Sequence, residues 1–120
     1  MLHTPRARRG MVVAPHALAS EAGLAVLREG GNAIEAAVAV ASTLAVVYPH
    51  MTGIGGDAFW LVKPAGGAVR YLGGCGAAGA DLAHYAERGL QQIPTRGPDA
   101  ALTVAGAVSS WSAALAISKR

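Results

Sequence analysis

The stretch HMTGIGGDAFWLV, residues 50–62, holds three glycines within four positions, directly before an apolar run. Its GIGGDA portion fits G-x-G-x-x-A, a variant of the dinucleotide-binding fingerprint. That fingerprint binds a pyrophosphate only where a strand precedes the glycines and a helix follows them, because the helix N-terminus faces the phosphates. The segments on either side of residues 50–62 therefore decide between a nucleotide site and a structural turn.

Two helices are predicted before the glycines. Apolar side chains recur at helical spacing through residues 16–29, and a pair of glycines ends this segment. Asn32 and Glu35 have the N-x-x-E spacing of a capping box, which predicts a second helix over residues 33–47. This second helix is apolar almost all round, as expected of a helix buried between layers, and it is shorter than the about 20 apolar residues of a membrane span.

Extended segments are predicted on both sides of this helix pair. GMVVA (10–14) is typical of a buried strand, and AFWLVK (58–63) with AVRYL (68–72) predicts an antiparallel hairpin. The side-chain-poor run GGCGAAGA (73–80) predicts a loop whose backbone lies close to another segment. Further elements follow: a short helix DLAHYAER (81–88), a short strand ALTV (101–104), and a last helix that opens after Gly106, contains Trp111 and is still in progress at Arg120.

A helix thus precedes GIGGDA and a strand follows it, which is the reverse of the order that a dinucleotide site requires. The glycines therefore predict a structural turn in which Gly53, Gly55 and Gly56 adopt positive φ or make tight backbone contacts. Asp57 is expected to accept hydrogen bonds from the amides of the same turn.

The composition indicates a single domain that lacks some of its neighbours. Of 120 residues, 52% are hydrophobic and 14% are charged, which excludes a disordered chain and favours membership of a larger body or an oligomer. The net charge of +3 comes largely from three arginines in a basic tail, residues 1–9, without the basic stripe of a nucleic-acid-binding protein.

No signal-peptide pattern follows, so a cytoplasmic location is expected. Cys75 is the only cysteine and the four histidines are scattered, so neither a metal site nor a cofactor is predicted.

Four separated motifs occur in order: GMVVAPHALAS (10–20), GGNAIEAA (30–37), YPHMTGIGGDAFW (48–60) and TRGPDAALTVAGAVSSW (95–111). They resemble the opening landmarks of the γ-glutamyltransferase family, with Ala105 where the family usually has proline. The matches extend over about residues 10–116. Several motifs in the correct order are far more specific than any one glycine pattern.

The resemblance implies an α+β fold, as part of the four-layer αββα sandwich of the N-terminal nucleophile hydrolases. Residues 10–120 would form the N-terminal portion of the large subunit. The partners would be the remainder of that subunit and a small catalytic subunit, which is released by self-cleavage and starts with the nucleophilic threonine. The family hydrolyses a γ-glutamyl amide or another small amide, or transfers its acyl group to an amine. No catalytic residue is expected within these 120 residues, so the chain alone is expected to be inactive.

The resemblance also places a substrate-pocket loop at Gly74, Cys75, Gly76 and Ala77. Family members that act on γ-glutamyl compounds carry an arginine here that binds the substrate α-carboxylate. This chain has Cys75 or Ala77 in its place, depending on the alignment, and the loop is most similar to a bacterial branch that includes oxamate amidohydrolases. His50 is expected either to bond nearby backbone or to line the pocket entrance.

Two alternatives remain open from the sequence. Cys75 could act as a thiol nucleophile with His50 or His84, although a packed, unreactive thiol is favoured. The chain could also be a non-catalytic module that associates with other chains through exposed apolar helices.

Overall fold

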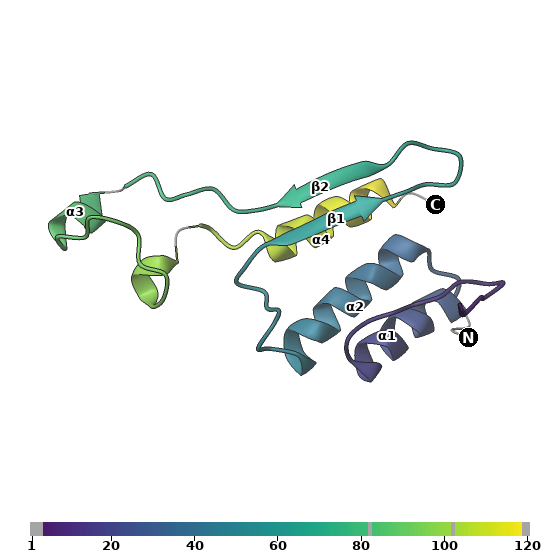
Figure 1. Cartoon of the computed structure of the whole chain (residues 1–120). Coiled ribbons are helices and arrows are strands. Elements are labelled where there is room, and N and C mark those ends of the chain that lie inside the picture. Colours follow the sequence, from purple (N-terminus) through teal and green to yellow (C-terminus); the bar gives the residue numbers. More distant parts are fainter. Residues whose placement is uncertain (1–3, 82, 102, 119–120) are drawn as a thin grey trace.

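The computed structural model describes residues 4–81, 83–101 and 103–118 (Figure 1). The elements are, in chain order, α1 (Ala17–Arg28), α2 (Ala33–Val47), β1 (Ala58–Val62), β2 (Arg70–Gly74), α3 (Ala83–Glu87), a 3-10 helix (Pro98–Ala100) and α4 (Ala107–Ile117). Figure 1 shows α1 beside α2 and the β1–β2 hairpin alongside α4. Helix α3 lies at the far end of the long excursion between β2 and α4, residues 75–106. The predicted α+β class is confirmed, as is the order of helix, turn and strand around residues 50–62.

Side-chain caps start both N-terminal helices. His16 Nδ1 accepts a hydrogen bond from the Leu18 N–H (3.3 Å) at the start of α1. The predicted capping box of α2 is complete, because Asn32 Oδ1 accepts from the N–H groups of Ile34 (2.9 Å) and Glu35 (3.1 Å) while Glu35 Oε2 accepts from the Asn32 N–H (2.7 Å). The helix pair therefore forms where local sequence signals predict it.

The second strand of the hairpin lies later in the chain than predicted. Ala58 pairs with Gly74 and Val62 with Arg70, so the second strand lies two residues later than the predicted segment 68–72. Gly74 therefore belongs to the sheet rather than to the loop. Glycine fits there because the strand end lies against α4, where an added Cβ would overlap the Ser110 side chain.

Helix α4 covers one face of the hairpin. Trp60 is buried against it, and its indole Nε1 donates to Ser110 Oγ (3.0 Å), which in turn donates to the Ala107 carbonyl (2.6 Å). Side chains alternate across a strand, so the neighbours of Trp60 face the opposite side. Phe59 and Leu61 are 63% and 78% exposed there.

Three predicted segments differ from the structure. Residues 10–14 form no strand among the described residues; an isolated apolar run needs a hydrogen-bonding neighbour, and Val12 packs near Gly23 of α1 instead. The predicted strand 101–104 contributes a single bridge, Thr103 to Ala78, and Leu102 lies outside the described residues. Helix α3 is shorter than the predicted 81–88: Asp81 Oδ1 accepts from the Ala83 N–H (2.9 Å), and Leu82 also lies outside the described residues.

Helix α4 ends at Ile117, with the Ser118 N–H bonded to the Leu115 carbonyl. The predicted continuation to Arg120 falls partly on residues 119–120, which lie outside the described residues.

The core consists almost entirely of small side chains. The buried hydrophobic residues of the described chain are Ala19, Ala36, Trp60, Ala107 and Ala114. The expectation that α2 is buried between layers is wrong for this chain, because Ala36 is its one buried residue and Val46 is 77% exposed. Within the described ranges, no helix combines the length and the apolar character needed to cross a membrane.

Candidate functional site

The glycine turn, the loop after β2 and the start of α4 meet through their backbones. The Gly56 carbonyl accepts from the N–H groups of Gly106 (3.0 Å) and Ala107 (2.9 Å), which ties the turn to the first residues of α4. Gly106 in turn lies against Gly74, where an added Cβ would overlap the Gly74 carbonyl oxygen. Three segments that are distant in sequence are thus joined at one end of the hairpin.

The predicted substrate-pocket loop is held closely by this junction. The Val104 N–H donates to the Ala77 carbonyl (3.0 Å), and an added Cβ at Gly76 would overlap the Val104 carbonyl oxygen. The prediction that residues 73–80 bring backbone close to another segment is therefore confirmed at Gly74 and Gly76. The neighbouring Cys75 and Ala77 are exposed.

The positive φ predicted for the glycines of the turn is wrong, and the predicted close backbone contact occurs in the described chain at the Gly56 carbonyl. Gly53, Gly55 and Gly56 have no positive φ, and a Cβ added at any of them would meet nothing within 4 Å. No steric demand therefore selects glycine at these three positions. The main-chain hydrogen bond from Met51 N–H to the Tyr48 carbonyl (3.1 Å) belongs to the preceding turn, directly after α2. The predicted bonding of Asp57 to the turn amides is also absent from the hydrogen bonds of the described residues, and Asp57 is exposed.

The candidate thiol and the histidines do not form a catalytic group. Cys75 is exposed, so the prediction of a packed thiol is wrong, and within the described part of the chain it has no hydrogen bond with His50 or His84. His50 is exposed, with its ring 4.2 Å from that of Tyr48, and makes no backbone hydrogen bond among the described residues. No nucleophile and base lie together in this part of the molecule.

A polar cluster that sequence reasoning missed lies on the excursion. Asp99 Oδ1 accepts from Arg88 Nη1 (3.0 Å) and lies 3.1 Å from His84 Nε2, which joins α3 to the 3-10 helix. His84 and Arg88 are four residues apart and so share one helix face, which is the signal that could have suggested a common partner. The cluster is largely exposed, and no group of three metal-binding side chains occurs in the described residues.

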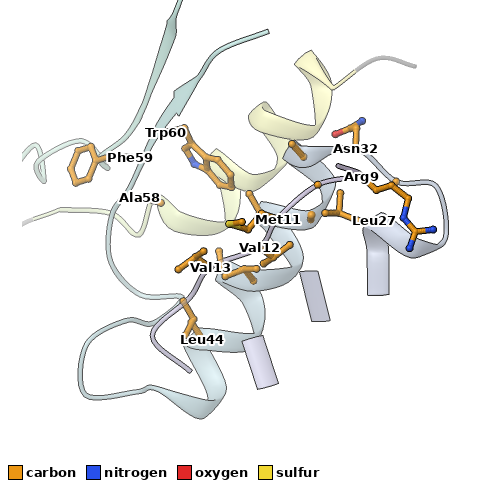
Figure 2. Close-up of a pocket in the computed structure, with 17 residues that line it drawn as sticks. Arg9, Met11, Val12, Val13, Leu27, Asn32, Leu44, Ala58, Phe59 and Trp60 are labelled. Atoms are coloured by element: carbon orange, nitrogen blue, oxygen red, sulfur yellow. The ribbon is translucent and has the colours of Figure 1, made fainter. Parts of the chain in front are cut away.

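A cavity of about 720 Å³ lies elsewhere, between residues 9–13, α1, α2 and β1 (Figure 2). Trp60 points toward it from β1, and Met11, Val12 and Val13 lie opposite (Figure 2). Its lining is mainly aliphatic, and none of the loop residues 74–77 contributes to it. The cavity therefore offers space for apolar side chains rather than a set of converging polar groups.

Helices pack against an antiparallel hairpin through a close-packed glycine junction, and solved gamma-glutamyltranspeptidase structures show this arrangement to be part of an N-terminal nucleophile hydrolase fold. Residues 19–117 match the sequence profile of the gamma-glutamyltranspeptidase family, and the chain belongs to that family.

The relatives are proenzymes that are several times longer. The chain is 58% identical over 110 residues to the oxamate amidohydrolase proenzyme of Klebsiella pneumoniae, covering 92% of this chain and 21% of that protein. It is 53% identical over 106 residues to a glutathione hydrolase-like proenzyme of Bacillus subtilis, covering 88% and 20%. The gamma-glutamyltranspeptidase structure from Helicobacter pylori superposes with a TM-score of 0.79 at 33% identity, covering 96% of this chain and 34% of that one. The chain thus spans about a fifth of the length of these curated relatives.

Proposed function

We propose that these 120 residues form the N-terminal part of the large subunit of an amidohydrolase that cleaves a small amide without a γ-glutamyl head group, with oxamate as the model substrate. Hydrolysis would break the amide C–N bond, release ammonia and leave oxalate. The attacking threonine would come from polypeptide encoded after Arg120, once self-cleavage has freed its α-amino group to act as the base. This chain would supply scaffold and one wall of the pocket.

The observation that carries this proposal is the chemistry of the loop after β2. Members of the family that act on γ-glutamyl compounds use an arginine here to bind an α-carboxylate, whereas Cys75, Gly76 and Ala77 carry no charge. No lysine or arginine occurs between Arg70 and Arg88. A charged hydrogen bond is worth about 1.5–3 kcal/mol, so its loss disfavours a γ-glutamyl substrate. The 58% identical relative is named for oxamate, which agrees with this substrate class.

The test uses the complete polypeptide, meaning this chain together with the residues encoded after Arg120. The expected results are self-cleavage into two subunits, ammonia release from oxamate, and little release of p-nitroaniline from γ-glutamyl-p-nitroanilide. Preferential turnover of the γ-glutamyl compound would overturn the proposed substrate class. A gene that ends at Arg120, or a complete polypeptide that hydrolyses neither amide, would overturn the enzymatic proposal and favour a module that only associates with other chains.

A further inference from the structure

The start of α4 packs against the backbone of the loop at residues 75–77. An added Cβ at Gly106 would overlap the Gly74 carbonyl oxygen and would lie 3.0 Å from the Gly76 nitrogen. The Gly106 N–H is itself fixed, because it donates to the Gly56 carbonyl at 3.0 Å. Gly106 therefore lies against the backbone on both sides of Cys75, and its N–H bond to Gly56 holds it there.

Steric contact is the one visible reason for glycine at this position. Gly106 has φ −105° and ψ −12°, which any residue can adopt. Replacing its hydrogen by a methyl group would leave the helix start conformationally allowed and would push the loop outward. The substitution Gly106→Ala would thus displace residues 74–76 without changing any residue of the loop itself.

Ser110, four residues after Gly106 in α4, also lies against Gly74. It is buried beneath Gly74, where an added Cβ would overlap the Ser110 Cβ. Its hydroxyl accepts from Trp60 Nε1 (3.0 Å) and donates to the Ala107 carbonyl (2.6 Å), so both the sheet and the helix hold this side chain in place.

We propose that Gly106 and Ser110 are positioning residues. They set the position of the Cys75–Ala77 loop relative to α4 and thereby the affinity for the small amide. This inference rests on the proposed function, because it takes that loop to be a wall of the substrate pocket. Gly106 lies against the backbone of Gly74 and Gly76, and Ser110 lies against Gly74, so each acts through the loop backbone.

The test compares Gly106→Ala with Gly79→Ala in the complete, self-cleaved polypeptide. Gly79 is a matched control, because it also lacks positive φ and an added Cβ there meets nothing within 4 Å. Gly106→Ala is expected to raise KM for oxamate about tenfold with kcat within about twofold of wild type, since a displaced wall weakens binding of substrate and transition state alike. Gly79→Ala is expected to change neither parameter.

A purely structural effect gives a different result. Partial unfolding reduces the amount of active enzyme and so lowers kcat while KM stays constant. Ser110→Gly provides a second variant if Gly106→Ala does not fold, because it removes the support beneath Gly74 without adding atoms. Ser112→Gly on the same helix is its control, since Ser112 is exposed and makes no side-chain hydrogen bond in the described part of the chain.

The outcomes separate this inference from the proposed function. A raised KM in Gly106→Ala or Ser110→Gly, but not in the two controls, supports the inference. A KM within twofold of wild type in every folded variant overturns it while wild-type turnover of oxamate upholds the proposed function. If the wild type prefers a γ-glutamyl amide, the proposed substrate fails and KM for that amide decides the inference. If the wild type hydrolyses neither amide, both proposals are overturned.

Discussion

Asn32 uses all of its side-chain polar atoms to join two parts of the chain. Its Oδ1 caps α2, while Nδ2 donates to the carbonyl (3.2 Å) and to Oγ (2.6 Å) of Ser118 at the end of α4. The first role follows from local sequence spacing, and the second could not be predicted, because it connects residues 86 positions apart. One amide thus serves both as a helix cap and as a link between helices.

Replacing Asn32 therefore separates these two contributions. Asn32→Ala in the complete polypeptide should lower the free energy of unfolding by about 1–2 kcal/mol for the lost cap, and more where Ser118 is left unpaired. Asn32→Ser keeps a capping oxygen but cannot reach Ser118, so it should cost less than the alanine change. Denaturant titration with circular dichroism measures both values. Equal losses for Ala and Ser would show that the cap contributes nothing.

The exposed Cys75 gives a second prediction at this scale. Because no base contacts its sulfur among the described residues, Cys75→Ser should leave kcat for oxamate within about twofold of wild type. The measurement is ammonia release by the complete polypeptide. A loss of about a thousandfold or more would instead make Cys75 the nucleophile, as expected when an attacking group is removed.

At the scale of elements, the helices defined by nearby residues are predicted more accurately than the strand whose bounds depend on contacts with distant residues. Helices α1 and α2 were predicted to within a residue or so, since caps and glycines define them locally. Strand β2 lies two residues later than the predicted segment 68–72, because contact with α4 decides where that strand ends. The glycine turn was placed correctly, but its steric reason was not, since no neighbouring segment of this chain packs against Gly53 or Gly55.

The excursion that carries α3 depends on one carboxylate. Asp99→Asn removes the charge that binds Arg88 and faces His84, so α3 should detach more often from the 3-10 helix. Exposed ion pairs contribute only about 0–1 kcal/mol, so global stability should barely change. Amide hydrogen exchange should rise within residues 83–100 and nowhere else. The control is Asp57→Asn, an exposed aspartate without a hydrogen bond in the described chain, which should leave that exchange unchanged.

The whole molecule is far less compact than its length predicts. Its radius of gyration is 18.1 Å, against about 14 Å for a compact domain of 120 residues. Its accessible surface is 9014 Å², whereas a compact monomer of 12.0 kDa exposes about 6000 Å². The excess of about 3000 Å² on this one chain is larger than the about 1000–2500 Å² that each partner commonly buries in an obligate interface, so the apolar composition is that of a part whose covering layers lie outside these residues.

The isolated chain should consequently self-associate through the open face of the hairpin. Phe59, Leu61 and Tyr71 are exposed on this face, opposite α4, and covering a leucine side chain contributes about 1.5–3 kcal/mol. The 120-residue chain should sediment above 12.0 kDa at micromolar concentration, and Leu61→Lys should shift it toward the monomer. Ser112→Lys adds the same charge at an exposed polar site of α4 and should have no effect. A chain that sediments as a monomer with native circular dichroism would contradict the need for covering layers. Equal shifts for both lysine variants would instead assign the association to net charge rather than to this face.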